Sequence, residues 1–322
     1  MIEQGADNLH LAILGRSGSG KSYFLRGLIE QAAQQGALCM VLDCSTDFQK
    51  YSSPNDTPFQ RINVTDPAFT INPLATEVAK GGLVAAQQLL SAIHSAFHMG
   101  NRATVALQKA TMGYFQQSPH PTLPDLIRYI NGQKKSVGLA TAFEPLELLS
   151  TLVHCGDQPI NLDLTESGIF ALGFDEIVDT KLRVLLVELV LQSVWTQWVS
   201  IEHDADHPLI VVLDECQNLS WEEGSMAVRI LREGRKFGIG GWFASQWVSG
   251  KTAISALGQA AFQANFRPDD NNIPALAKKL AQSGGSAPEW QKLIRSMKVG
   301  QFLHSRRDGR TILVNVSKRQ VT

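Results

Sequence analysis

Eight residues near the start of the chain have the spacing of a phosphate-binding loop. They follow the pattern G-x-x-x-x-G-K-[ST] and lie between an apolar run at 9–14 and a helix-like run that begins at residue 23. Glycines let successive backbone N–H groups turn inward around a phosphate, where a Cβ atom would obstruct the approach. The lysine adds charge for the β- and γ-phosphates, and the last hydroxyl can coordinate Mg²⁺. We therefore expect ATP and Mg²⁺ to bind at Gly15, Arg16, Ser17, Gly18, Ser19, Gly20, Lys21 and Ser22.

Two carboxylates end the most apolar strand that the sequence predicts. Residues 209–213 read Leu-Ile-Val-Val-Leu, which is typical of a central strand buried on both faces, and Asp214 and Glu215 follow them. We expect Asp214 to hold Mg²⁺ through water, and Glu215 to orient and deprotonate the water that attacks the γ-phosphate. The alternative role for Glu215 is to cap the next helix. Together with the loop, the pair predicts hydrolysis of ATP rather than binding alone.

A glutamine and a basic cluster are the remaining candidates for chemistry. Gln246 ends the predicted strand at 240–245, where its amide could contact the γ-phosphate or the attacking water. The helix and turn before that strand carry Arg229, Arg232, Arg235 and Lys236. A solvated basic helix end is the alternative explanation for the first two arginines.

Alternating strands and helices are predicted around these motifs. We expect strands at 9–14, 37–42, 160–164, 169–174, 208–214 and 240–245, and helices at 22–35, 180–201, 273–282 and 288–297. A terminal hairpin is expected to pair 300–305 with 311–316, because Asp-Gly in the turn suits type I′ geometry. The stretch 47–73 is turn-rich and is interpreted as mostly loop. This order predicts an α/β domain with a mostly parallel central sheet.

Residues 76–151 show helical periodicity and no clear buried strand. We interpret them as a helical insertion in a discontinuous domain formed by 1–75 and 152–322. Insertions of this kind often carry contacts to partners or substrates.

The segment after the paired carboxylates resembles a known family. Residues 231–239, Leu-Arg-Glu-Gly-Arg-Lys-Phe-Gly-Ile, lead into Trp-Phe-Ala-Ser-Gln at 242–246, and this block is similar to HerA-type ATPases of the HerA/FtsK group of RecA-like P-loop motors. ATPases of conjugation and type IV secretion belong to the same group. Asp43 and the Asn-Pro-Leu at 72–74 also resemble the family. The resemblance covers 9–73 and 160–316 and implies an additional-strand RecA-like fold.

The resemblance implies an ATPase that acts as a homo-oligomeric ring, a hexamer, and translocates double-stranded DNA with ATP bound between subunits. By position, Arg235 is expected to reach across the subunit interface and stabilise the transition state, with Arg232 as second choice. HerA proteins usually carry a small β-barrel before the phosphate loop, and eight residues precede Leu9 here. We therefore expect a minimal ring or a partner in place of the barrel, and a nuclease or other effector as protein partner.

Two other functions remain open at this stage. One is a conjugation or secretion ATPase that moves DNA–protein or protein cargo. The other is a nucleotide-controlled assembly subunit of a defence complex that does not translocate processively. DNA-stimulated turnover is expected of the HerA-type DNA motor, whereas slow turnover with ATP-dependent assembly is expected of the assembly subunit.

Charge and composition constrain these functions. The formal net charge is −1 over 322 residues, which argues against a protein that coats nucleic acid non-specifically. Basic residues concentrate in 286–322, and Arg306, Arg307 and Arg310 cluster at the tip of the predicted hairpin. They could contact phosphates or simply solvate the tip.

The remaining features indicate a cytoplasmic protein. Residues 1–10 have no signal-peptide pattern, the apolar run at 182–201 is interrupted by charged side chains, and the four cysteines show no zinc spacing. His94 and His98, spaced i, i+4, could pair on a metal, as could residues 202–207, but neither set is a complete ligand group. We interpret both as solvated surface and expect no membrane span.

Overall fold

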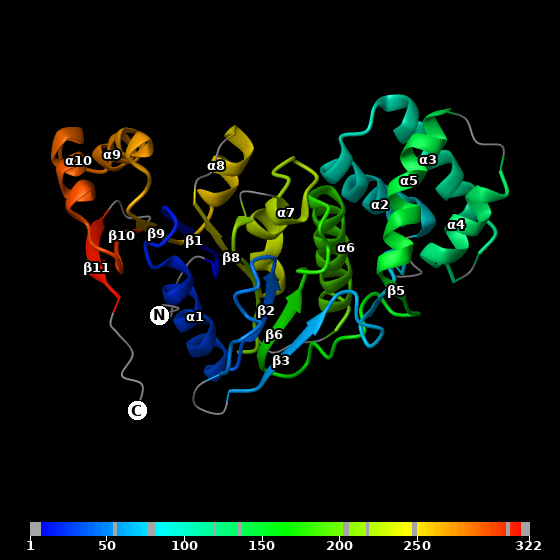
Figure 1. The fold of residues 1–322 in the computed structure, drawn as a ribbon, viewed down its shortest axis with the longest axis horizontal. Coiled ribbons are helices and arrows are strands. Elements are labelled where there is room, and N and C mark those ends of the chain that lie inside the picture. Colours follow the sequence, from blue (N-terminus) through cyan, green and yellow to red (C-terminus); the bar gives the residue numbers. More distant parts are fainter. Residues whose placement is uncertain are drawn as a thin grey trace.

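A nine-stranded sheet forms the centre of the computed structural model, which describes residues 8–53, 57–75, 81–118, 120–133, 137–201, 206–216, 219–246, 250–306 and 310–316. The strand order is β11-β10-β9-β1-β8-β7-β2-β6-β3, and neighbours from β9 to β3 are parallel (Figure 1). The strands are β1 Leu11–Leu14, β2 Leu38–Asp43, β3 Phe59–Asn63, β6 Gly168–Gly173, β7 Leu209–Leu213, β8 Ile239–Ser245, β9 Phe262–Phe266, β10 Gln301–Arg306 and β11 Thr311–Asn315.

Helices cover both faces of the sheet because successive residues of its central strands point to opposite sides. Cys39 and Val41 of β2 pack in the core that includes α1, whereas Met40 and Leu42 pack in the core that includes α6 and α7. These helices and the remaining ones around the sheet are α1 Lys21–Gln34, α6 Thr180–Trp198, α7 Met226–Glu233, α8 Lys251–Leu257, α9 Ile273–Ala281 and α10 Ala287–Ser296.

A group of four helices lies beyond α6, on the side of the sheet opposite β11 (Figure 1). It comprises α2 Gly81–Phe97, α3 Asn101–Phe115, α4 Leu123–Asn131 and α5 Val137–Leu152, called here the helical segment. Leu107, Leu126 and Leu146 are completely buried in its core. The segment is joined to the sheet region at β4 Thr70–Ile71, which pairs with β5 His154–Cys155. Asn72, just after β4, links this connection to the helical segment, because its Nδ2 donates to the Pro121 carbonyl at 2.9 Å.

The mostly parallel sheet and the terminal antiparallel hairpin confirm the predicted fold class. Three local expectations were wrong. Residues 160–164 form no strand beyond a single bridge at Ile160, since the side chains of Asn161 and Asp163 accept hydrogen bonds from the backbones of Thr70 and Thr165.

Two strands of the main sheet lie where the sequence predicted none. β3 falls within the stretch that was interpreted as loop. It is an edge strand of the sheet, and three of its five residues, Gln60, Arg61 and Asn63, are polar. β9 lies directly beside β1, yet Gln263 and Asn265 interrupt its apolar pattern. The tip of the hairpin, 307–309, lies outside the described residues.

Within the described residues, no helix combines the length and the apolar composition that crossing a bilayer requires.

Candidate nucleotide site

Three neighbouring strands bring the predicted site residues to one edge of the sheet. β8 lies between β1 and β7, and Leu14 is in register with Ser245 while Leu213 is in register with Phe243. The phosphate loop after β1, the glutamine after β8 and the carboxylates after β7 therefore start from adjacent carboxyl ends. This edge is where open parallel sheets bind their ligands.

Glycines shape the loop at two points where a side chain would not fit. A Cβ atom on Gly15 would lie 2.5 Å from the Cβ of Phe266, so the loop leaves β1 in close contact with the end of β9. Gly20 has φ +104°, a left-handed conformation that directs the chain into α1. The loop thus opens onto the N-terminus of a helix of 14 residues, where unpaired backbone N–H groups favour an anion.

Lys21 folds back across the loop. Its Nζ donates to the Arg16 carbonyl at 3.1 Å, and the residue is 5% exposed. Burial lowers the pKa of Lys21, and the negative charges of Glu215, Asp214 and Asp269 oppose that shift. The ammonium group is therefore held at the mouth of the loop among carboxylates, where a phosphate group could replace the carbonyl as its partner.

A hydroxyl and a carboxylate meet between the loop and β7. Ser22 Oγ donates to Asp214 Oδ2 at 3.0 Å. Burial raises the pKa of Asp214, whereas the hydrogen bond from Ser22 favours its charged form. Oxygen ligands of these two kinds hold Mg²⁺ in phosphate-loop enzymes. Ser22 and Asp214 are therefore the candidate Mg²⁺ ligands.

Glu215 adopts a strained backbone conformation beside this pair. Its φ is +59°, which is rare for a residue with a long side chain. Its N–H donates to Asp214 Oδ1 at 3.0 Å, and its carboxylate accepts from Gln246 Nε2 at 3.2 and 3.4 Å. The helix α7 begins only at Met226, so Glu215 does not cap it. Backbone strain of this kind clusters at functional sites, and here it turns the carboxylate toward the end of β8.

Asp43 has a structural role at the end of β2. Its carboxylate accepts from the N–H groups of Asp47 at 3.0 Å and Phe48 at 3.2 Å, and Arg61 Nε lies 3.7 Å away. Burial raises the pKa of Asp43, and these hydrogen bonds and the arginine oppose the shift. The carboxylate therefore caps the loop that follows β2.

The basic cluster lies away from the site of its own chain. Arg229 stacks over Trp195, with 4.5 Å from its Cζ to the ring centroid, and Arg232 pairs with Glu223. Arg235 lies on the exposed short helix Gly234–Phe237, which precedes the amino end of β8. Because a strand rises roughly 3.3 Å per residue, about 20 Å of sheet separate Arg235 from Gln246. Arg235 therefore does not serve the phosphate loop of the same chain.

Two segments that the sequence did not indicate support the loop. Arg16 donates its N–H to the Arg267 carbonyl at 3.0 Å, and Gly300 donates its N–H to the Ser19 carbonyl at 2.9 Å. Asp269, just after β9, contributes negative charge at Lys21. The run Arg-Pro-Asp-Asp at 267–270 would have indicated this segment if β9 had been recognised as a strand. The polar residues Gln263 and Asn265 within β9 prevented that prediction.

The helical segment touches the loop that follows the carboxylates. Ser91 Oγ donates to the Gly224 carbonyl at 2.9 Å, while His94 Nε2 and His98 Nδ1 lie 3.3 and 3.2 Å from the two carboxylate oxygens of Glu222. We call these three side chains, His94, His98 and Glu222, the histidine–glutamate contact. The histidines are exposed, as expected, but they share an acidic partner.

No group of three or more His, Cys, Asp or Glu side chains could hold a metal ion in the part of the chain that the structure describes. Most of the second candidate metal-binding run, residues 202–207, lies outside the described residues, because the structure does not describe 202–205.

Known proteins are similar to part of the chain in sequence and to nearly all of it in fold. The family model described as the central domain of helicase HerA matches residues 6–86. VirB4 of Thermoanaerobacter pseudethanolicus has a TM-score of 0.74 at 16% identity, covering 98% of this chain and 91% of that one. The bacterial conjugative coupling protein TrwB has a TM-score of 0.66 at 15% identity, covering 98% and 87%. TrwB in complex with ADP and Mg²⁺ gives 0.65 at 16% identity, covering 98% and 87%. No curated protein matches in sequence.

The family model confirms the resemblance to HerA-type ATPases over residues 6–86, and the solved structures confirm the RecA-like fold. The similarity of fold to VirB4 and TrwB also spans the helical segment, which the sequence motifs did not cover.

Proposed function

We propose that this protein is an ATPase that uses Mg²⁺ and converts hydrolysis into movement of double-stranded DNA. The observation that carries the proposal is the pair of contacts at the carboxyl edge of the sheet, from Ser22 to Asp214 and from Gln246 to Glu215. These contacts support a metal-binding role for Ser22 and Asp214 and a general-base role for Glu215 beside the phosphate loop. TrwB, which has a similar fold, has been solved with ADP and Mg²⁺.

In this proposal each residue of the edge has a separate task. Lys21 would exchange its carbonyl partner for the β- and γ-phosphates. Ser22 and Asp214 would hold Mg²⁺, which would supply positive charge against the phosphates. Glu215 takes a proton from the attacking water. Gln246 fixes the carboxylate of Glu215 through its Nε2 donor. The role of Gln246 is positioning, because it acts through Glu215.

A second subunit completes the site in this proposal. A transition-state arginine is worth roughly three to five orders of magnitude in related phosphoryl transfer reactions. Arg235 is exposed at the amino edge of the sheet, on the order of 20 Å from its own phosphate loop. It can therefore act only on a neighbouring copy, which is the arrangement expected of a hexameric ring.

The second candidate is a conjugation or secretion ATPase whose cargo is DNA–protein or protein. The fold similarity to VirB4 and TrwB over 98% of the chain favours it, since that similarity includes the helical segment. Both motors would work with a protein partner. A nucleotide-controlled assembly subunit of a defence complex would use the same ATP site with slow turnover.

The test is steady-state ATP hydrolysis by the purified protein, with and without long double-stranded DNA, at low and moderate salt. We expect DNA to raise turnover, and we expect Lys21→Ala to abolish the stimulated rate because the phosphates lose their cation. Turnover that DNA leaves unchanged would contradict the DNA motor and favour the protein-cargo or assembly function. Turnover that survives Lys21→Ala would contradict the site itself.

Complementation tests the arginine. Arg235→Ala and Glu215→Gln should each be inactive, and mixing them should restore part of the activity because a mixed ring contains intact composite sites. Lys236→Ala is the matched control, since it removes a neighbouring exposed charge. Inactivity of every mixture would contradict a role for Arg235 between subunits, and the same experiment with Arg232→Ala would then test the second choice.

A further inference from the structure

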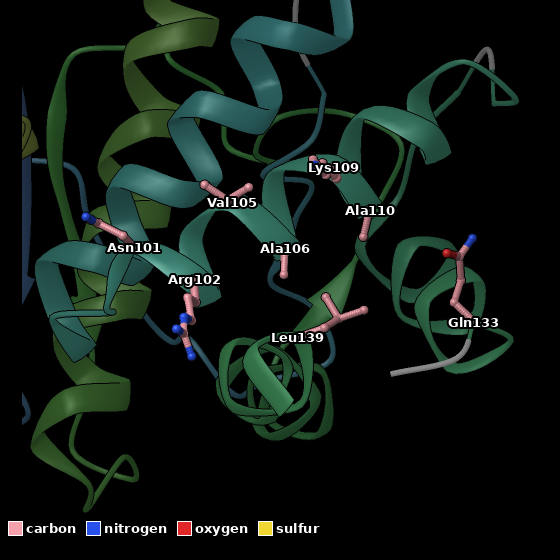
Figure 2. A pocket seen from close by; sticks show the side chains of 8 residues that line it. All are labelled: Asn101, Arg102, Val105, Ala106, Lys109, Ala110, Gln133 and Leu139. Atoms are coloured by element: carbon pink, nitrogen blue, oxygen red, sulfur yellow. The ribbon is translucent and has the colours of Figure 1, made fainter. Parts of the chain in front are cut away.

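A cavity of about 620 Å³ opens on the helical segment, between α3, α5 and the end of α4 (Figure 2). Ala106 and Ala110 of α3 face Leu139 of α5 across it, and Val105 borders it with 47% of its surface exposed. The recess exists because alanines occupy the α3 side, where larger side chains would close the gap. The centre of the recess is therefore apolar, whereas Asn101 and Gln133 add polar groups to its lining and the recess is open to solvent.

Two cations border this apolar recess. Arg102 and Lys109 lie seven residues apart on α3, which is two turns or roughly 10 Å along one side of the helix. Neither forms an ion pair with an acidic side chain of the described residues. Arg128 of α4, in the same segment, does pair, with Asp125 at 2.7 Å. The border of the recess thus carries positive charge that no described acidic side chain neutralises in an ion pair.

We propose that this recess binds an acidic amphipathic helix of a partner protein. Apolar side chains of that helix would fill the space between Ala106, Ala110 and Leu139, and carboxylates would pair with Arg102 and Lys109. A helix suits the recess because its anchors recur every three to four residues and match the spacing of the two cations. Charge complementarity selects acidic partners, and the apolar lining supplies the burial that gives affinity.

The same observations disfavour nucleic acid as the occupant. Binding of a phosphate backbone relies on several cations and on polar or aromatic contacts, because phosphates remain strongly hydrated. The described lining of the recess offers two cations and two amide side chains, Asn101 and Gln133, around alanine, valine and leucine, and no aromatic side chain. This proposal does not depend on ATP hydrolysis, so it can fail or hold without affecting the proposed function.

The test uses two designed peptides of about 16 residues, long enough to form a helix. One carries leucines at three- and four-residue spacing with glutamates beside them, and the other replaces each glutamate with lysine. Each is labelled with fluorescein and titrated with the full chain while anisotropy is measured. We expect the acidic peptide to bind, the basic peptide not to bind, and rising salt to weaken the complex.

Charge reversal provides the decisive comparison. Arg102→Glu combined with Lys109→Glu should weaken the acidic peptide at least about tenfold, since two charge pairs become repulsive. The same variant should gain affinity for the basic peptide. Arg128→Glu is the control, because it reverses a cation outside the recess and should leave affinity unchanged.

Three results would overturn the proposal. They are equal binding of both peptides, acidic-peptide affinity that the double variant does not alter, and displacement of the acidic peptide by a short DNA duplex that the double variant no longer binds. The last result would assign the recess to nucleic acid. Because Arg102 and Lys109 are exposed, a melting curve of the double variant should match that of the parent and show that folding is intact.

Discussion

The carboxyl edge of the sheet and the helical segment are built on opposite principles. At the edge, Lys21 and Asp214 are buried polar groups that are bonded to other polar groups, and Glu215 holds a strained backbone conformation. In the helical segment, leucines fill the core and the charged residues stand at the surface. The first arrangement gives up stability to position charged groups for chemistry, whereas the second gains stability from apolar burial and leaves its charged residues exposed.

The largest expected effect tests the chemical side of this comparison. Glu215→Gln should reduce turnover by roughly 10²- to 10⁴-fold, because it removes the general base, while ATP still binds. Single-turnover hydrolysis and nucleotide titration separate the two effects. The substitution also removes a negative charge that acts on Lys21 and would repel the phosphates, so nucleotide affinity should not fall. If turnover stayed within a few-fold of the parent, the water would have another base.

The second prediction tests the stability of the helical segment. Leu146→Ala removes a side chain that is completely buried, so it should lower the free energy of unfolding by about 2–5 kcal/mol. Urea unfolding measures the loss, and ATP affinity below the transition should be unchanged. Leu148→Ala is the matched control on the same helix, because that side chain is 47% exposed. Equal losses in both variants would mean that the segment is not packed as described.

The chemical edge could be predicted from the sequence and much of its surroundings could not. The phosphate loop, Asp214, Glu215 and Gln246 follow fixed spacing after apolar runs, and the strand order brings them together. Arg267 and Asp269 escaped prediction because β9 lacks an apolar pattern. The partner of the two histidines could not be foreseen, since Glu222 lies more than a hundred residues away and no local pattern reports such a contact.

The third prediction concerns a buried acid at the boundary between the two regions. Glu188 of α6 accepts the N–H of Met226 at 2.8 Å, and its second oxygen has no hydrogen-bond partner among the described residues. Burial raises the pKa of Glu188 to about 7. The folded state therefore holds a proton that the unfolded state has released, so stability falls as pH rises through 7. Between about pH 6 and about pH 8 the loss should be about 1 kcal/mol.

Comparison with Glu188→Gln isolates this effect from other titrating groups. The amide is neutral at every pH, and its oxygen can still accept the N–H of Met226. Urea unfolding of both proteins over the same pH range should show a steeper decline for the parent. Parallel curves for the two proteins would contradict a proton on Glu188 in the folded state.

The smallest effect tests whether the two regions act on each other. The histidine–glutamate contact joins α2 to the loop that follows Glu215, but its side chains are 43–68% exposed, so it should contribute no more than about 1 kcal/mol. A double-mutant cycle of His94→Ala with Glu222→Gln, in urea unfolding and in turnover, measures the coupling. Glu223→Gln is the matched control, because its partner Arg232 lies outside α2. Coupling in both measurements would mean that binding at the helical segment can alter turnover at Asp214 and Glu215. Coupling in stability alone would mean that the contact only stabilises the packing of α2 against the loop.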